Sequence, residues 1–497
     1  MLAAQELCAQ RGLDFGAVFA HQYVLSRSDH PTIEGWGGPM PMRGWQLSHC
    51  RRLDCRDIVD ATGTRLGWLL GVAVDADGAV VSQRGLRLRT TPALRDFWES
   101  VTAQIEPLAG KYIAILLTDQ GCRMYFDPVL DLPAVFNRDE GLVAGSPLLA
   151  IARAVRVNPR IDYNDILADG GNYGLQNTCD AGVLRAISNH YLDLDHFDLH
   201  RHWPPAGMSF EDDFDTAEDA AHHIIRRLGQ IARALITHHI TAMPISGGND
   251  SRTLVYAARD ALGQLDHAYA HRINWITKFD CFLGKKLADE LGVPLQLIDA
   301  VGALDKGKVS KLLTRRLTRQ FRFATGYMQP PKRAELLAYN KIPETELVLR
   351  GNIMDMTRAN IWPRGSEAVE LEHMFHKLGI GGCPVKDRVS LWSSDYLAWQ
   401  DSLPENARCR IYDFAFVEQL LPNTLGARLM GFGRANYVNP FNDRQLITTC
   451  MKLSPPLRKS GKFNTILHAA VGAPDMVRAR KLGKQKQLHD QVDQLFG

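Results

Sequence analysis

The chain has 497 residues, which is long enough for two or three domains with sizeable hydrophobic cores. Its 45% hydrophobic and 23% charged residues are typical of a globular protein and exclude a disordered one. The formal net charge of +3 is too close to neutral to indicate a nucleic-acid partner, and we expect none.

Nine cysteines lie far apart in the chain, which favours a reducing compartment over a disulfide framework. The first residues carry both charges and lack the apolar core of a signal peptide. No stretch approaches the roughly 18 uncharged apolar residues of a membrane span. We therefore expect a cytoplasmic protein without a membrane partner.

The N-terminal part contains short strand-like runs separated by turn residues. Residues 68–74 form one such run, and others follow at 112–117, 122–126, 134–136 and 142–144. A helix is expected over 146–154. The pattern predicts an α+β domain with largely antiparallel sheets over residues 1–205.

The second half, residues 212–497, alternates between helical and strand-like segments. Asp215 and Glu218 form a plausible capping pair for a long helix through Leu235. Strands are expected at 268–270, 294–298 and 347–349, and a helix at 280–291 with Asp280 as its N-cap. Such alternation predicts an α/β doubly wound parallel sheet with ligands at the carboxyl ends of its strands. From about residue 389 the chain is mostly helical.

The segment Pro244 to Ser251 reads as a turn between a buried strand and a helix. Gly247 and Gly248 allow the backbone to approach an anion, and the free N–H groups of the helix start point at it. Ser246 and Ser251 can add hydroxyl donors, whereas Asp250 is suited to a metal ion. A plain glycine turn is the alternative interpretation.

This Ser-Gly-Gly-x-Asp-Ser pattern resembles the pyrophosphate loop (PP-loop) of ATP pyrophosphatases, and the chain has no GxxxxGK[ST] loop. More widely, the chain resembles the asparagine-synthetase-like family. The residues that carry this wider resemblance are 108–112, 126–128, 146–149, the link 189–195, Gly351 to Asp355, and Lys481. The resemblance implies an Ntn-hydrolase-like N-terminal domain of two layered antiparallel sheets, followed by an ATP pyrophosphatase domain.

The resemblance also implies roles for individual residues. Asp250 and Asp355 would hold Mg²⁺, and Asp355 and Lys481 would be catalytic. The alternatives are that Asp355 caps a helix and that Lys481 belongs to a solvated basic face, while Lys462 is a weaker candidate for a phosphate contact. The expected ATP-binding residues are Ser246, Gly247, Gly248, Asp250, Ser251 and Gly351.

Two positions depart from the family pattern. Glutamine-hydrolysing members use a cysteine directly after the initiator methionine, whereas this chain has Leu2, and its nearest cysteine is Cys8. In this respect the chain is similar to the β-lactam synthetases and lasso-peptide cyclases, which lack glutaminase activity. The second departure is Asn352, because an amide cannot serve as a general base. Asp395, Tyr396 and Glu418 are unranked candidates for that base.

Residues 193–202 alternate acidic and histidine side chains with apolar ones. Ligands at alternating positions are geometrically possible, but a half-buried strand or hairpin is the favoured interpretation. His238 and His239 are interpreted as structural.

The sequence therefore predicts an ATP- and Mg²⁺-dependent, AMP-forming amide ligase that adenylates a carboxylate and joins it to an amine. The substrate would be a small molecule or a peptide, and a partner protein could deliver a precursor peptide for macrolactam formation. The alternatives are an inactive nucleotide-binding scaffold and a glutamine-hydrolysing asparagine synthase. The substrates and the oligomeric state are not readable from the sequence.

Overall fold

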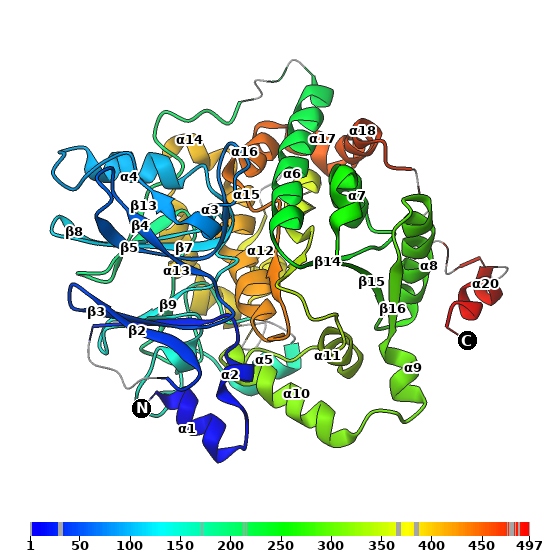
Figure 1. Cartoon of the computed structure of the whole chain (residues 1–497), viewed down its shortest axis with the longest axis horizontal. Coiled ribbons are helices and arrows are strands. Elements are labelled where there is room, and N and C mark those ends of the chain that lie inside the picture. Colours follow the sequence, from blue (N-terminus) through cyan, green and yellow to red (C-terminus); the bar gives the residue numbers. More distant parts are fainter. Residues whose placement is uncertain are drawn as a thin grey trace.

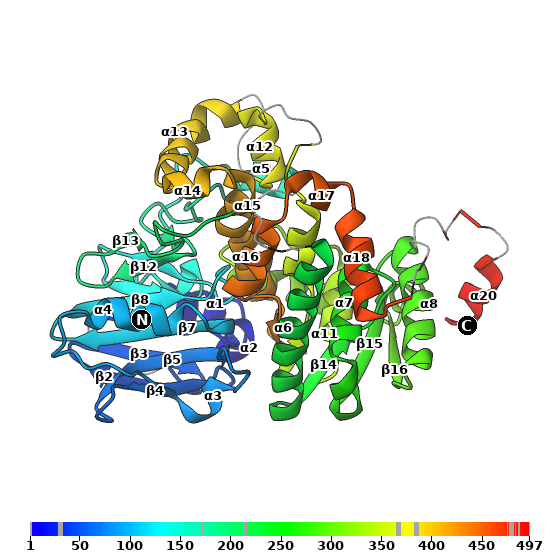
Figure 2. The same ribbon diagram turned by 90° about the horizontal axis from the view of Figure 1, so that it is seen from above.

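A computed structural model shows two β-rich halves joined by a helical C-terminal part (Figure 1). It describes residues 2–27, 33–169, 172–211, 214, 216–363, 369–381, 387–474, 476, 482, 484–485 and 488–496. Figure 2 shows the N-terminal sheets on one side of the molecule and the later sheet with its helices on the other.

The N-terminal half contains two stacked sheets. The first is antiparallel and has the strand order β11-β9-β10-β1-β3-β2. Its strands are β1 Tyr23–Ser26, β2 Trp36–Met42, β3 Trp45–Cys50, β9 Val135–Asn137, β10 Leu142–Ala144 and β11 Leu184–Arg185. The second sheet has the order β13-β12-β8-β7-β5-β4-β6 and is antiparallel except for the β4–β6 pair. Its strands are β4 Cys55–Val59, β5 Arg65–Val74, β6 Leu86–Arg87, β7 Ala109–Thr118, β8 Gly121–Phe126, β12 His190–Asp193 and β13 Asp198–Arg201.

Apolar side chains from the two sheets form a common core. Tyr23 and Leu47 of the first sheet belong to the same buried cluster as Trp68 and Ile115 of the second. The other face of the second sheet packs against helix α4, Phe97–Ile105. The remaining helices of this half are α1 Ala3–Gln10, α2 Phe15–Val18, α3 Val81–Arg84 and α5 Tyr163–Asp169. The expected α+β half with antiparallel sheets is confirmed.

The second half is built on a five-stranded, fully parallel sheet with the order β16-β15-β14-β17-β18. Its strands are β14 Thr241–Pro244, β15 His267–Arg272, β16 Leu295–Asp299, β17 Leu347–Leu349 and β18 Asn436–Val438. In chain order this is the 3-2-1-4-5 arrangement, and the strand order reverses between β14 and β17. The expected parallel sheet is confirmed, and its fifth strand, β18, comes from the region expected to be mostly helical.

Helices surround this sheet and continue to the C-terminus. Those between β13 and β17 are α6 Ala217–His238, α7 Asn249–Ala257, α8 Trp275–Glu290, α9 Ala300–Asp305, α10 Lys311–Ala324 and α11 Arg333–Asn340. Those that follow are α12 Leu371–Lys377, α13 Arg388–Asp401, α14 Glu405–Arg408, α15 Ile411–Ala415, α16 Arg444–Lys452, α17 Pro455–Lys459, α18 Lys462–Val471 and α20 His489–Gln494. Among the described residues, no helix combines the length and apolarity needed to cross a membrane.

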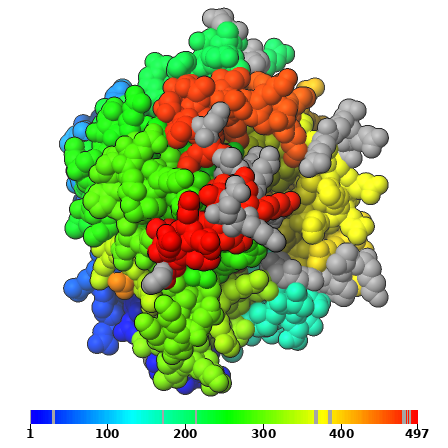
Figure 3. Space-filling view, turned by 90° about the vertical axis from the view of Figure 1, so that its right-hand side faces the viewer, coloured from blue at the N-terminus to red at the C-terminus, as the bar shows by residue number. Residues whose placement is uncertain are grey.

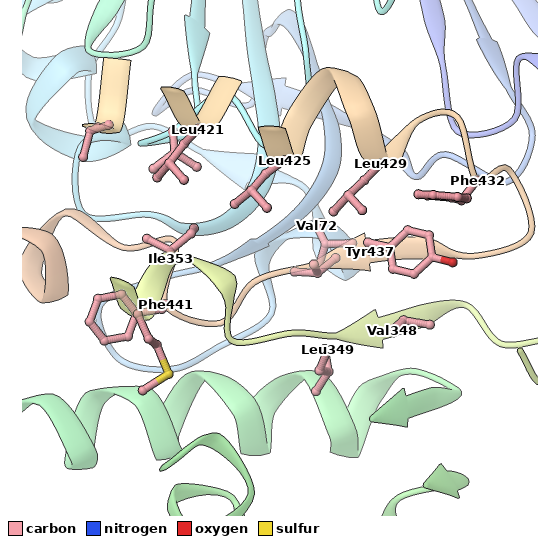
Figure 4. Close-up of a cluster of buried hydrophobic side chains, with 14 of the residues drawn as sticks. Val72, Val348, Leu349, Ile353, Leu421, Leu425, Leu429, Phe432, Tyr437 and Phe441 are labelled. Carbon is pink, nitrogen blue, oxygen red and sulfur yellow. The ribbon is translucent and has the colours of Figure 1, made fainter. Parts of the chain in front are cut away.

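A helical segment after α15 closes the core beside β17 and β18. It includes two π-helical stretches, Phe416–Leu420 and Pro422–Ala427. Figure 4 shows Leu421, Leu425 and Leu429 of this segment above the strands that carry Leu349 and Tyr437. All of these side chains belong to one buried cluster, so the segment fixes the strands whose ends form the site described below.

The C-terminal helix α20 packs against the outer surface of α8, as Figure 3 shows in red over green. The side chain of Val492 is completely buried and shares an apolar cluster with Phe279 and Leu283 of α8. An ion pair between Lys278 and Asp493 adds to this contact.

The two halves meet through buried polar groups from the motifs that carry the family resemblance. The side-chain amide of Asn442 donates hydrogen bonds of 2.7 Å to the Gly110 carbonyl and to Asp127 Oδ1. Lys111, which is also buried, donates to the Tyr437 carbonyl at 3.2 Å. Burial and the neighbouring Asp131 raise the pKa of Asp127. These residues therefore hold the two sheet systems together.

Three predictions about helix boundaries are wrong. Residues 146–154 form only the 3₁₀ turn Pro147–Leu149, because Asn137 donates a hydrogen bond to the Ala150 carbonyl and Ala3 donates one to the Ile151 carbonyl. Helix α8 begins before residue 280, since Asn274 caps it by accepting the N–H groups of Ile276 and Thr277.

The cap of α6 is Thr216, whose hydroxyl accepts the N–H of Asp219 at 3.1 Å. This replaces the expected pair of Asp215 and Glu218, and Asp215 lies outside the described residues.

Candidate functional site

A cavity of about 270 Å³ lies at the carboxyl ends of β14, β15 and β17. Ser246 and Asp250 line it after β14, Tyr269 to His271 line it at the end of β15, and Gly351 and Asn352 line it after β17. This is the point where the strand order reverses, and doubly wound sheets bind their ligands at such a point. The expected position of the loop at a strand end is confirmed.

The loop between β14 and α7 is held by its own serines. Ser251 Oγ accepts the N–H of Ser246 and donates to the Pro244 carbonyl, both at 3.0 Å. Ser246 Oγ accepts the N–H of Gly248 at 3.3 Å, which leaves its hydroxyl hydrogen available to a ligand. Ser251 therefore shapes the loop, whereas Ser246 retains a free donor.

Helix α7 starts without a side-chain cap. Gly248 occupies the N-cap position, and among the described residues no side chain caps the first turn. These groups and the helix dipole favour an anion at the cavity end of α7. The geometry therefore agrees with the anion cradle expected from the sequence.

Glycines allow the neighbouring elements to approach the loop closely. A Cβ on Gly284 of α8 would lie 2.3 Å from the Ile245 carbonyl oxygen, and one on Gly247 would lie 2.3 Å from Leu283 Cδ1. A Cβ on Gly351 would lie 3.1 Å from the Asp250 carbonyl oxygen. Gly351 thus brings the end of β17 against the start of α7.

The structure brings Asp250 and Asp355 together through Arg358. Arg358 Nη2 lies 3.0 Å from Asp250 Oδ2, and the same guanidinium forms a second bond to Asp250 and an ion pair with Asp355. All three side chains are partly buried, with exposed fractions between 27% and 32%. Burial raises the pKa of Asp250, and the hydrogen bond from Arg358 opposes that rise. Asp355 lies in the 3₁₀ segment Asn352–Arg358 and is not its cap.

The carboxylate pair suits a divalent cation chemically. The carboxylates of Asp250 and Asp355 face the same position, which the positively charged guanidinium of Arg358 occupies. Mg²⁺ prefers carboxylate oxygens as ligands. Both oxygens of Asp250 are bonded to Arg358, so a metal ion shared by Asp250 and Asp355 requires Arg358 to move. Sequence reasoning missed Arg358, although its position three residues after Asp355 is a recognisable pairing signal.

Arg350 is a second functional candidate that sequence reasoning missed. It lines the cavity and bonds to the Tyr339 hydroxyl, with its guanidinium 5.6 Å from the centre of the Tyr339 ring. No ion pair joins it to a carboxylate among the described residues. A fixed cation beside the anion-binding loop can stabilise negative charge on a bound ligand.

Two titratable groups in the cavity have shifted pKa values. Burial raises the pKa of Asp280 to about 6, and burial together with Arg350 lowers the pKa of His271 to about 4. His271 Nδ1 is buried and has no hydrogen-bond partner. A neutral imidazole and a perturbed carboxyl group in one cavity are candidates for the missing general base.

The three base candidates considered from the sequence do not line this cavity. Asp395 pairs with Arg160 at 2.8 Å, and Tyr396 packs against Phe375 and Trp399. Glu418 is buried, accepts the Trp399 indole N–H and is paired with Arg201. They serve packing and the junction between the halves.

Lys481 lies outside the described residues. Before it, the Pro474 carbonyl accepts a hydrogen bond from Arg252 of α7. After it, the buried Leu482 shares an apolar cluster with Leu283 of α8. Lys462, the weaker candidate, is exposed at the start of α18 and does not line the cavity.

The acidic and histidine-rich segment forms the hairpin of β12 and β13, as one of its two interpretations predicts. Its side chains pair with neighbours, for example Asp193 with His196 and His202 with Glu106. Within the described ranges no cluster of three or more histidine, cysteine or acidic residues is arranged for a metal ion.

Cys8, the cysteine nearest the start of the chain, is buried in α1. Burial and the nearby Asp14 raise the pKa of its thiol to about 11, so it remains a neutral thiol near pH 7. This environment does not favour a nucleophilic cysteine.

Comparison with known proteins gives no assignment, since no family model matches the chain and no curated protein matches it significantly.

Proposed function

We propose that the chain is an ATP-dependent, AMP-forming amide ligase. The observation that carries this proposal is the cavity at the strand-order reversal, where the uncapped start of α7 meets Arg350 and Asp250. Asp355 does not line the cavity but is joined to Asp250 through Arg358. This arrangement can bind a triphosphate without a P-loop lysine, because main-chain N–H groups and a guanidinium supply the positive potential.

Each group has a distinct part in this mechanism. The N–H groups of Asn249 to Ser251 at the start of α7 and the Ser246 hydroxyl would hold the phosphates, with Gly351 keeping β17 close enough to complete the pocket. Asp250 and Asp355 would hold Mg²⁺, which when bound supplies charge neutralisation for the polyphosphate. Lys481 would neutralise the charge that develops on the attacked carboxyl group.

The amine must lose a proton during amide formation, and Asn352 cannot accept it. His271 is neutral near pH 7 and lines the cavity, as does Asp280. We assign proton acceptance to Asp280, because its pKa of about 6 suits a general base near pH 7 better than the pKa of about 4 of His271. An amine attack on an acyl-adenylate then yields the amide and AMP.

The test of the proposed reaction is isotope exchange between labelled pyrophosphate and ATP in the presence of a panel of carboxylic acids and acidic peptides. We expect acid-dependent exchange that is lost in Asp250→Asn. Absence of both exchange and AMP formation with every acid would contradict the ligase proposal.

The main alternative is a nucleotide-binding scaffold without catalysis. It is favoured by Arg358, which occupies the position between the two carboxylates. Binding of ATP without exchange or AMP formation would support the scaffold. A glutamine-hydrolysing asparagine synthase is disfavoured by Leu2 and by the buried thiol of Cys8.

A further inference from the structure

An arginine-rich groove lies apart from the nucleotide cavity, between α1, α5 and α10 (Figure 1). It has a volume of about 480 Å³. Five arginines line it: Arg11, Arg315, Arg319, Arg322 and Arg333. No aspartate or glutamate is among its lining residues.

The positive charges of this groove lack counter-charges in the part of the chain that the structure describes. None of the five guanidinium groups forms an ion pair with a described carboxylate. Arg322 Nε and the Tyr163 hydroxyl are both buried without a hydrogen-bond partner. Arg11, Arg315, Arg319 and Arg333 are exposed and Arg322 is half-buried, so water can solvate most of these charges. The two buried atoms without partners are costly, and a ligand that enters the groove can supply their missing hydrogen bonds.

Three aromatic residues line the groove and contact one another. Arg322 lies 6.0 Å from the centre of the Tyr163 ring, and Tyr163 meets Tyr327 edge-on at 5.7 Å. Phe323 also meets Tyr327 edge-on, at 6.0 Å. Tyr327 has φ +65°, a left-handed conformation that is rare outside glycine and is often retained at binding sites.

We propose that this groove binds an acidic peptide segment. Arginine forks recognise carboxylates in a bidentate manner, and the apolar contacts offered by Leu7 and Phe323 suit peptide side chains. Single-stranded nucleic acid is bound through stacking of successive bases on parallel ring faces, whereas the rings here meet edge-on. The near-neutral net charge of +3 also lacks the broad basic surface of a nucleic-acid binder.

The spacing of the arginines on α10 fits an extended peptide. Arg315 and Arg319 are separated by about 6 Å along the helix axis. Alternate side chains of an extended chain are about 6.6 Å apart on one face. Acidic residues at every second position can therefore meet successive arginines.

Helix α11 connects the groove to the nucleotide cavity. Arg333 at its start lines the groove, and Tyr339 near its end bonds to Arg350 in the cavity. If the chain is an amide ligase, the groove would hold the peptide that carries the reacting carboxylate. This role as the substrate site rests on the proposed function, whereas the binding of an acidic peptide to the groove needs no ATP.

The test uses fluorescence anisotropy of the full chain with a labelled heptapeptide of alternating glutamate and alanine, without nucleotide. The double variant R315A/R319A removes two groove arginines. The matched control K311A/R316A removes two exposed charges from the same helix that do not line the groove. Circular dichroism verifies that both variants remain folded.

We expect the peptide to bind wild type and the control K311A/R316A with dissociation constants that agree within about twofold. Its affinity for R315A/R319A should be at least about tenfold lower. A glutamine version of the peptide should not bind. An equal loss in both double variants, no binding to wild type, or tighter binding of a single-stranded oligonucleotide of the same charge would overturn the proposal. Failure of the pyrophosphate exchange would leave this result unchanged, so the two proposals are tested separately.

Discussion

Arg358 is the residue that most directly controls the Asp250–Asp355 pair. Its guanidinium neutralises two carboxylates that would otherwise repel each other, and of these Asp250 lines the cavity. A bound divalent cation can replace that positive charge. A metal ion bound to this pair would therefore compete with Arg358 for the same carboxylates.

We predict that Arg358→Ala lowers the free energy of unfolding by about 1–3 kcal/mol in the presence of a chelator. The variant should bind Mn²⁺ without nucleotide more tightly than wild type, as measured by electron paramagnetic resonance. Arg358→Lys keeps the charge and serves as the control. An unchanged Mn²⁺ affinity in Arg358→Ala would show that Arg358 does not compete with a cation.

Asp280 gives a prediction about pH. Its pKa is raised by burial to about 6 in the folded protein, above its ordinary value of 3.8, so the folded state binds more protons than the unfolded state over this range. The contribution of Asp280 to stability therefore falls as the pH rises from 3.8 through about 6. Above that range the buried carboxylate is charged and costs about 1–3 kcal/mol.

Asp280→Asn removes this charge. We therefore expect the melting temperature of the variant minus that of wild type to be larger at about pH 7.5 than at about pH 4.5. Differential scanning calorimetry at both pH values measures this difference. A difference that does not change with pH would mean that Asp280 is not the titrating group.

At the scale of elements, the contact between α8 and the loop depends on Gly284. Its substitution by alanine would place Cβ 2.3 Å from the Ile245 carbonyl oxygen, and a backbone atom cannot rotate away. We expect Gly284→Ala to cost about 1–3 kcal/mol and to weaken nucleotide binding, because the loop must shift. Thermal unfolding and nucleotide titration measure the two effects.

The matched control is Gly263→Ala, since a Cβ on Gly263 meets no atom within 4 Å. It should leave both measurements near the wild-type values. If Gly284→Ala behaves like this control, close packing of α8 does not position the loop.

The sequence predicted elements well where short apolar runs lie between turn residues. β10 and β17 match the expected ranges, and β7, β8 and β16 lie within three residues of them, because buried strands have this simple signature. β18 was missed because its three residues lie within a mostly helical region. The expected helix over 146–154 failed because distant residues bond to its backbone carbonyls.

The candidate site was predictable only in part. A continuous motif identified the loop from Ser246 to Ser251, but Arg350, Arg358 and His271 join it through folding. The arginine-rich groove was also missed, because Arg11 and Arg315 are far apart in the sequence. Such convergence depends on tertiary packing, which local patterns do not encode.

At the scale of the whole molecule, Arg227 of α6 joins the two halves. Its side chain is paired with the buried Asp443 at 2.9 Å and donates to the carbonyls of Asp75 and Ala76 in the N-terminal half. We expect Arg227→Ala to cost about 3–5 kcal/mol, because Asp443 is left buried without its partner. Calorimetry should also show the two halves of the variant unfolding in more separate transitions than in wild type, and the same number and separation of transitions in both proteins would contradict a coupling role.

The central claim is that the cavity at the ends of β14, β15 and β17 binds ATP. Its most direct test is isothermal titration calorimetry of the full chain with α,β-methylene-ATP and Mg²⁺, using Asn352→Trp to fill the cavity and exposed Asn360→Trp as the control. We predict one-to-one binding to wild type and Asn360→Trp, and a loss of at least about tenfold in Asn352→Trp. No binding to wild type, or equal binding to Asn352→Trp, would contradict this account.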